Sequence, residues 1–393
     1  MADSNLAQLA FLVEEPTAYN AALGSGDEMQ LLRYTSESLS YDITSTSSQE
    51  IRSDRATADL IQTGASTSGG FNFELSATTF DDFFAGALYS AGWSTPTSIT
   101  PTTATYTASS STLAAGSSAF TDVVVGQWLQ VKGLTTAGTG YFRVTTRTSA
   151  TQLVVFTSLS ANDGGTQCTI AGSYIRNGTT EKSFAFEKKI VVNSTTATNV
   201  FFQYTGMIIN QMSLSAKSDA VMTGSFDFMG ASADVSSTTA VNATLVAATT
   251  TPVLNATSNV GGVFEGRPTF SAIEGCLIQG IDLTLNNNLR QIKGIGRKEA
   301  CDVGVGQCDV KGNLTAYFFG MSIYQKYLDG TETAISFRTI DSDGHGYVFT
   351  LPRLKIETDK TNIGGSNQDI MENMTYVALY DSNSNCQIQI DKF

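Results

Sequence analysis

The sequence repeats itself between its two ends, and this repeat limits the fold more than any other feature. The alternating segment Leu39-Ser-Tyr-Asp-Ile43 recurs as Ile281-Asp-Leu-Thr-Leu285. A constant spacing of 242 residues separates three pairs: Leu39 and Ile281, Gly64 and Gly306, and Gly70 and Gly312. Self-similarity at one spacing indicates a duplicated structural unit. We therefore expect two copies of one domain.

A helix is predicted after the first strands of each copy. In the second copy, Ile323, Tyr324, Tyr327 and Leu328 form an apolar patch, which Gly330 closes. In the first copy, helical spacing puts five apolar residues on one face: Phe80, Phe83, Phe84, Ala87 and Leu88. Both copies thus follow one plan of strands, a helix and further strands.

The start of the first helix carries its own signals. Thr78 or Thr79 is a predicted N-cap, and Asp81 and Asp82 suit the positive end of the helix dipole. Adjacent helical residues point about 100° apart, so Asp81 and Asp82 are not expected to act as a catalytic carboxylate pair.

Composition favours β structure. Only 15% of residues are charged, whereas 41% are apolar and 10% are aromatic, enough to fill folded cores. Sparse charge with many Ser, Thr and Gly residues is typical of sheets and turns rather than of long helices. We therefore predict a mainly β protein of β-sandwich or barrel type, long enough for several domains.

The chain divides into five segments. After a turn-rich exit near Pro96, short strands separated by Gly and Thr turns indicate a small inserted domain. The first copy resumes at residues 182–189, which align loosely with residues 347–355. The predicted segments are an N-terminal arm (1–36), a first domain (37–95 and 176–232), an inserted outer β domain (96–175), a linker (233–263) and a second domain (264–393).

Charge and cysteine usage narrow the possible roles. The net charge of −13 should repel nucleic acid rather than bind it. We expect synthesis in the cytoplasm, since the N-terminus lacks a secretory signal and no apolar run is long enough to span a membrane. Five scattered cysteines beside a single histidine argue against a zinc site, and we expect buried free thiols.

His345 is the only histidine and therefore the only possible centre for a serine or cysteine triad. It lies in Asp341-Ser-Asp343-Gly-His345-Gly346, a pattern that favours a hairpin turn. Asp341 and Asp343 have part of a calcium-loop spacing, but Pro352 replaces the required glutamate at the twelfth position. The turn interpretation is preferred over catalysis or metal binding.

The remaining candidates also favour structural roles. Trp128 could stack on a ligand, but its alternating strand favours a core position. The pairs Arg52/Arg55 and Lys188/Lys189 have acidic neighbours, so a solvated surface or a salt bridge between subunits is preferred over a phosphate site. We predict no enzyme activity, with no catalytic, cofactor-binding or metal-binding residue and no cofactor.

A set of motifs resembles the major tail tube proteins of long-tailed, siphovirus-type bacteriophages. The resemblance covers about residues 6–95 and 175–393, which leaves the insert as a variable decoration. The motifs are residues 184–189, 204–215 and 221–230 in the first copy, and 276–285, 286–290, 295–296, 312–314 and 349–353 in the second.

This resemblance implies a structural virion protein with two tube-type β domains, each with a flanking helix. Related proteins carry one such domain and form six-membered rings, so the duplication implies a trimeric ring with pseudo-sixfold symmetry. Strands shared between neighbours would satisfy the sheet edges that a lone subunit leaves open. Stacked rings would form an acidic, β-lined conduit for DNA ejection, through which DNA passes without specific binding.

The resemblance also implies the partners and the location. We expect contacts with the tape measure, tail terminator and distal tail proteins, no membrane association, and a place in the phage tail after synthesis in the host bacterium. Two alternatives remain open. One is a secreted or surface β-rich adhesin, and the other is a tail-associated carbohydrate-active protein, whose paired carboxylates could be distant in sequence.

Overall fold

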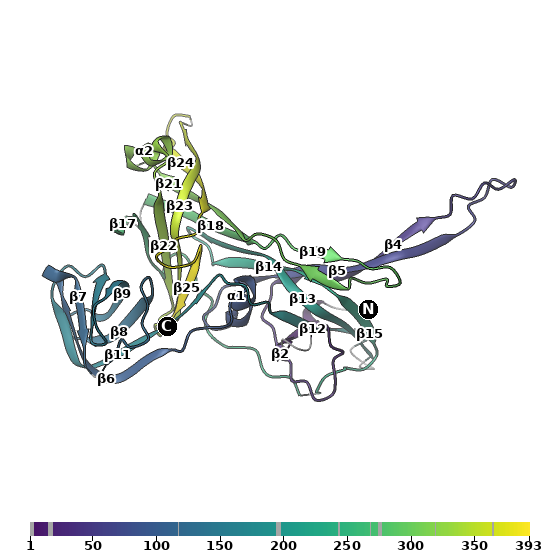
Figure 1. The fold of residues 1–393 in the computed structure, drawn as a ribbon, viewed down its shortest axis with the longest axis horizontal. Helices are drawn as coiled ribbons and strands as arrows, with labels where there is room; N and C mark the ends of the chain where they lie inside the picture. Colours follow the sequence, from purple (N-terminus) through teal and green to yellow (C-terminus); the bar gives the residue numbers. More distant parts are fainter. Residues whose placement is uncertain are drawn as a thin grey trace.

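The computed structural model describes residues 4–14, 19–116, 118–193, 198–242, 244–267, 269–273, 277–318, 320–363 and 365–393. The chain is mainly β, as the composition predicts, with two short α-helices among the described residues. Figure 1 shows an elongated molecule in which one long hairpin, β4–β5, projects far beyond the body.

Ten elements of the first half form one group around the helix α1. A 3-10 turn at Ser4–Leu6 precedes them. They are β1 (Gln8–Val13), β2 (Gln30–Leu31), β3 (Ser36–Glu37), β4 (Ser40–Ser47), β5 (Leu60–Glu74), α1 (Asp81–Ala87), β12 (Ser183–Asn193), β13 (Thr198–Lys217), β14 (Thr223–Gly230) and β15 (Ser232–Ser236).

Eleven elements of the second half form a corresponding group. They are β16 (Val260–Glu265), β17 (Ser271–Ile273), β18 (Ile278–Asn286), β19 (Arg290–Ile292), β20 (Asp302–Gly304), β21 (Asp309–Tyr317), α2 (Met321–Asp329), β22 (Thr333–Ile340), β23 (Gly346–Asn362), β24 (Met371–Ala378) and β25 (Gln389–Lys392).

The two halves have the same order of antiparallel strand pairing. In the first half, the neighbours run β4, β5, β14, β13, β12 and β1. In the second half, they run β18, β21, β24, β23, β22 and β16. Each helix follows the second strand of its order, and α1 contacts β13 as α2 contacts β23.

Bulges lie at matching positions in the two halves. Between β13 and β14, Asn210 is skipped in the register, and between β23 and β24 the skipped residue is Glu357. When the two bulges are superposed, Phe228 of β14 corresponds to Tyr376 of β24. Gly69 lies opposite Phe228 and Gly312 lies opposite Tyr376, so these two glycines also correspond. The strand registers of the two halves can therefore be compared residue by residue.

This comparison corrects the alignment drawn from the sequence spacing. Gly312 corresponds to Gly69 and not to Gly70, and burial agrees, because Phe71 then matches the equally buried Leu314. A slip of one residue moves every side chain of a strand to the opposite face, so constant spacing alone could not give the register. Residues 182–189 likewise correspond to β22 and not to residues 347–355, which lie in β23.

The main core joins both halves. It is rich in phenylalanine, with Phe71, Phe83 and Phe226 in mutual ring contact and fully or almost fully buried. The predicted helical face is confirmed, since all five of its apolar residues are buried. Burial of aromatic rings at this density supplies most of the stabilisation of such a sheet.

The predicted N-cap of the first helix is wrong. The helix begins at Asp81, and its N-cap residue is Phe80, which makes no side-chain capping bond. Thr79 Oγ1 instead hydrogen-bonds with Ser76 and Thr249 hydroxyls, so the linker competes for the side chain that would have capped the helix. The second helix ends as predicted, with Gly330 in the left-handed region at a φ of 60°.

The segment between α1 and β12 forms a small β unit with its own core of buried residues such as Phe120, Phe142 and Ile170. Its elements are β6 (Thr97–Thr107), a 3-10 turn (Ala108–Ser110), β7 (Thr112–Ala115), β8 (Trp128–Leu134), β9 (Gly138–Arg147), β10 (Gln152–Phe156) and β11 (Asp163–Arg176). The end of β11 leaves this unit and pairs with β25, which joins it to the second half.

The arm and the linker are both bound to the body. β1, within the N-terminal arm, pairs with β12, and the linker contacts β2 through the isolated bridge between Gln30 and Val246. Burial of the cysteines is only partly as expected. Cys168 and Cys386 are buried, Cys308 is half-buried, and Cys301, directly before β20, is exposed. Cys276 lies outside the described residues.

Candidate assembly surface

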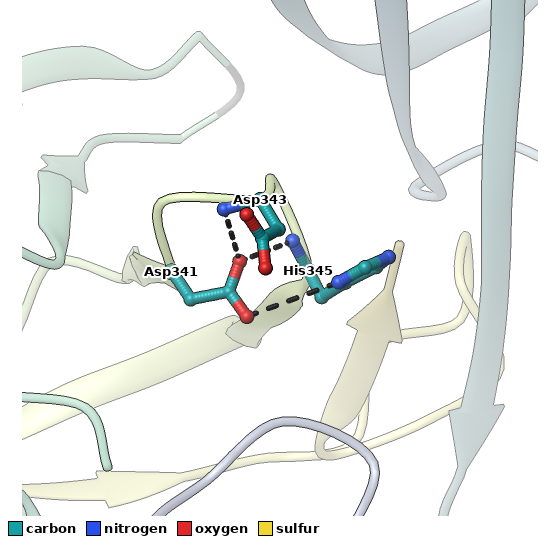
Figure 2. A group of neighbouring side chains, drawn as sticks. All are labelled: Asp341, Asp343 and His345. Carbon is teal, nitrogen blue, oxygen red and sulfur yellow. Dashed lines mark hydrogen bonds and ion pairs between the residues drawn. The ribbon is translucent and has the colours of Figure 1, made fainter. Parts of the chain in front are cut away.

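The turn around His345 joins β22 to β23, as the sequence predicts. Figure 2 shows that Asp341 Oδ1 accepts backbone N–H bonds from Asp343 and His345, at 2.9 and 2.8 Å. His345 Nδ1 lies 3.8 Å from Asp341 Oδ2. Ligand atoms of the three side chains lie within 4.8 Å of one another. This arrangement caps a tight turn.

The surroundings of this turn do not favour a cation. Lys132 Nζ donates to the Asp343 backbone oxygen at 2.8 Å, which brings a positive charge beside the cluster. Asp343 and His345 are exposed. A solvated aspartate and histidine next to a lysine bind a metal weakly, since water competes for each ligand.

Asp81 and Asp82 have different surroundings. Asp81 accepts a hydrogen bond from the Tyr347 hydroxyl at 2.7 Å and pairs with Lys392 Nζ at 2.6 Å, whereas Asp82 is exposed. Burial, followed by the charge of Asp81, raises the pKa of Tyr347 well above its usual range. Asp81 thus anchors the C-terminal strand β25 to the first helix, a role that the sequence did not indicate.

One member of each basic pair forms an ion pair within the chain. Lys188 Nζ lies 3.2 Å from Glu37, and Arg52 pairs with Asp54 at 2.7 Å in the loop of the projecting hairpin. The Arg52–Asp54 pair is solvent-exposed, so its contribution to stability is small.

Trp128 is a core residue, as its strand pattern predicts. Its ring is fully buried against Phe156 and Phe264, and its backbone N–H donates to Asp391 Oδ1 at 3.0 Å. Burial raises the pKa of Asp391 to about 7. Trp128 therefore attaches the inserted unit to the second half of the chain.

A buried acidic pair, Asp359 on β23 and Glu372 on β24, escaped the sequence analysis. Their exposed fractions are 8% and 0%, and within the described residues no group outside the pair donates a hydrogen bond to their four carboxyl oxygens. Burial, followed by the neighbouring Asp359, raises the pKa of Glu372 to about 7. The sequence feature that could have revealed the pair is the position of Glu372. It lies two residues before the buried Met374 in an alternating strand, which places it on the inward face.

Among the described strands, β4 and the distal part of β23 each leave one edge open. β4 pairs along one edge with β5, and no other described strand pairs with its second edge. The distal part of β23, from Thr358 to its end, pairs only with β24. Open edges invite pairing with another chain.

The projecting hairpin carries exposed apolar side chains. Leu60 and Ile61 are 65% and 52% exposed, and Ile51 in the loop is fully exposed. The hairpin extends away from the core (Figure 1), so the chain itself does not cover these residues. Apolar groups concentrated on one protruding element mark an interaction surface.

The sheet face opposite the core is polar. Asp227 on β14 and Asp282 on β18 alternate with buried neighbours, so they point away from the core. A shallow groove on this face is lined mainly by uncharged polar residues, among them Asn72, Ser225 and Thr284. Lys311 on β21 is exposed on the same face.

Comparison with known proteins agrees with this picture. A family model described as phage tail tube protein matches residues 4–378, which is nearly the whole chain. A search of curated proteins found no match. Neither helix of the described residues has the length and apolar character needed to cross a bilayer.

Proposed function

The chain belongs to the phage tail tube protein family, and we propose that three copies form a ring whose stacking builds the tail tube. Membership makes it a structural protein of the bacteriophage tail. The observation that supports a three-chain ring most strongly is the identical order of strand pairing in the two halves. A chain with two equivalent units needs three copies to make a six-unit ring.

The proposed domains follow the same repeat. The first tube domain comprises residues 37–95 and 176–232, joined by β1 of the arm, and the second comprises residues 264–393, joined by β16, which begins at Val260. The inserted unit of residues 96–175 lies on the far side of the body from the projecting hairpin (Figure 1). In this proposal the insert decorates the outside of the tube.

We assign the polar sheet face to the channel. The opposite face is filled by the aromatic core and both helices, so only the polar face is free to line a lumen. Asp227 and Asp282 would then repeat around the channel wall. Carboxylates there keep the DNA backbone solvated, so DNA slides through the conduit during ejection without being held.

The remaining partners follow from the same role. In a tail, the tube would contact the tape measure protein inside it, and the terminator and distal tail proteins at its two ends. Synthesis in the cytoplasm of the host bacterium belongs to the same proposal.

Electron microscopy of the purified protein tests the proposal. Concentrated protein is expected to form rings or hollow tubes in negative stain, without other phage components. Particles that remain single chains at every concentration and salt condition would contradict it.

A further inference from the structure

The chain contains a junction between its own two halves. The distal part of β13 pairs with β18, so that Met212 lies opposite Leu285 and Ser213 opposite Thr284. Met212 and Leu285 are fully buried, so this pairing continues the core as well as the sheet. One continuous sheet therefore runs from β4 through both halves to β23.

Each strand of this junction has a counterpart at an open edge. The matching bulges make Gln211 correspond to Thr358 and Ser213 to Lys360. On the other side, β18 corresponds to β3 and β4. Lys311 corresponds to Ser68, since each precedes one of the two matched glycines. Thr284 lies opposite Lys311 and Ser40 lies opposite Ser68, so Thr284 corresponds to Ser40. The open edges of β4 and of the distal part of β23 thus correspond to the two strands that pair in the internal junction, but within one chain they do not pair with each other.

The hairpins of the two halves also correspond in register. Gln291 lies opposite Val303 in the β19–β20 ribbon, and Ser47 lies opposite Leu60 in the β4–β5 hairpin at the matching position. Their surroundings differ greatly. Val303 is 3% exposed, whereas Leu60 is 65% exposed.

Val303 is buried because the second-half ribbon places this residue against the first half, while Ile292 and Asp302 of the same ribbon stay exposed. Val303 packs in a cluster with Tyr89 and Ile208, and the Ala65 N–H donates to the Lys298 oxygen at 2.8 Å. The projecting hairpin has no such body beneath it within one chain. A second copy joined at the open edges would supply that body.

We propose that the junction between chains reproduces the junction within the chain. The distal part of β23 pairs antiparallel with β4 of a second copy, with Lys360 opposite Ser40 and Asp359 opposite Tyr41. The β4–β5 hairpin of that copy lies across β23 and β24, and Leu60 is buried there as Val303 is buried within the chain. This inference rests on the proposed ring and gives it a residue register.

Cysteine cross-linking tests the register. Lys360→Cys with Ser40→Cys, in a C301S background that removes the exposed native thiol, is expected to give disulfide-linked dimers and trimers on oxidation. Directly opposite Cβ atoms lie about 4.5–5.5 Å apart, close enough for a disulfide after small adjustments. The products should stop at the trimer, because the ring is closed.

The matched control is Lys355→Cys with Ser40→Cys. Lys355 is exposed on the same strand, five residues from Lys360, which is about 17 Å along a strand. This pair and each single variant should stay at least tenfold less cross-linked. Two results would overturn the register without contradicting the proposed ring. One is equal cross-linking of both pairs, and the other is no cross-linking of the Lys360/Ser40 pair in samples where microscopy shows rings.

Hydrogen exchange on the unmodified chain gives a second test. Amides of Ser40–Asp42 and Thr358–Thr361 that face the open edges should exchange roughly 100-fold more slowly in rings than in single chains, because ladder hydrogen bonds form there. Unchanged exchange in rings would refute the strand pairing. Absence of any ring would instead refute the proposed function, and the junction with it.

Discussion

At the scale of single residues, local patterns predicted the positions of Trp128 and His345 but not the N-cap of the first helix. Trp128 was assigned to the core from its alternating strand, and His345 to a turn from its Asp and Gly neighbours. The sequence did not indicate the contacts of Asp81 with Tyr347 and Lys392. Nor did it indicate that Asp359 and Glu372 form a buried pair between two strands. Contacts between distant segments depend on strand register, and local pattern does not contain that register.

The acidic pair gives a prediction about pH. The pKa of Glu372 in the folded chain, about 7, lies above its ordinary value of 4.5. The folded state therefore holds this proton more tightly than the unfolded state. The resulting stabilisation is present below about pH 4.5 and is lost as the pH rises through 7.

Glu372→Gln mimics the protonated form at every pH. At pH 8 the variant should melt roughly 2–4 °C above the natural chain, the shift that about 1 kcal/mol produces in a domain of this size. The difference should vanish near pH 4.5. Asp391 also titrates near 7 in both proteins, so only the difference between them reports Glu372. A variant that is less stable at pH 8 would contradict the assignment.

At the scale of elements, the order of strands, helix and further strands in each half was predicted, but the register was not. Constant glycine spacing matched Gly70 with Gly312, whereas the strand pairing matches Gly69. The projecting hairpin was also missed, because its strands alternate like any others. The outer parts of β4 and β5 differ from the other strands only in that no other part of the chain packs on them. The sequence does not show which segments pack on a given strand.

The hairpin allows a test of its proposed contact. Leu60→Asp should leave the single chain folded, since the side chain is 65% exposed. It should reduce ring formation at least tenfold, because burying a leucine contributes about 1.5–3 kcal/mol. Ile61→Asp, on the opposite face of the same strand, should still form single rings. Sedimentation measures both variants, and equal loss of rings in both would contradict the assigned face.

The inserted unit allows a second test at this scale. Replacing residues 97–172 by a short Gly/Ser linker keeps the end of β11 that pairs with β25. Rings should still form, because the open edges lie elsewhere. The second half should lose stability, by roughly 1.5–3 kcal/mol for each aromatic ring uncovered, since Phe264 and Phe270 pack on Trp128 or its neighbours.

Thermal melting and microscopy of the deletion variant check both statements. Changing Phe264 and Phe270 to Ser in the deleted chain serves as a control for exposed apolar surface. A deleted chain that is folded but never forms rings would show that the insert takes part in assembly.

At the scale of the whole molecule, the repeat predicted a chain of two similar units, and composition predicted the mainly β fold. The channel charge gives a prediction here. Natural rings should not bind DNA measurably at low salt, where a positive lumen would bind most strongly. The double variant Asp227→Lys and Asp282→Lys should bind DNA, with an affinity that falls steeply as salt is raised.

The control for the channel is a charge reversal elsewhere. Asp122→Lys with Asp343→Lys changes the net charge equally at exposed positions away from the polar sheet face. These rings should bind DNA far more weakly than the channel variant in a filter or mobility-shift assay. Equal binding by both variants would mean that net charge, and not the channel wall, excludes DNA.

The central claim is that three chains make one ring, and the mass of a single ring tests it most directly. Native mass spectrometry of isolated rings should give three times the chain mass of 41.7 kDa. The same rings should show sixfold features in averaged electron micrographs, because each chain supplies two units. A ring of six chains would contradict the account, since the two halves of each chain would then not be equivalent units.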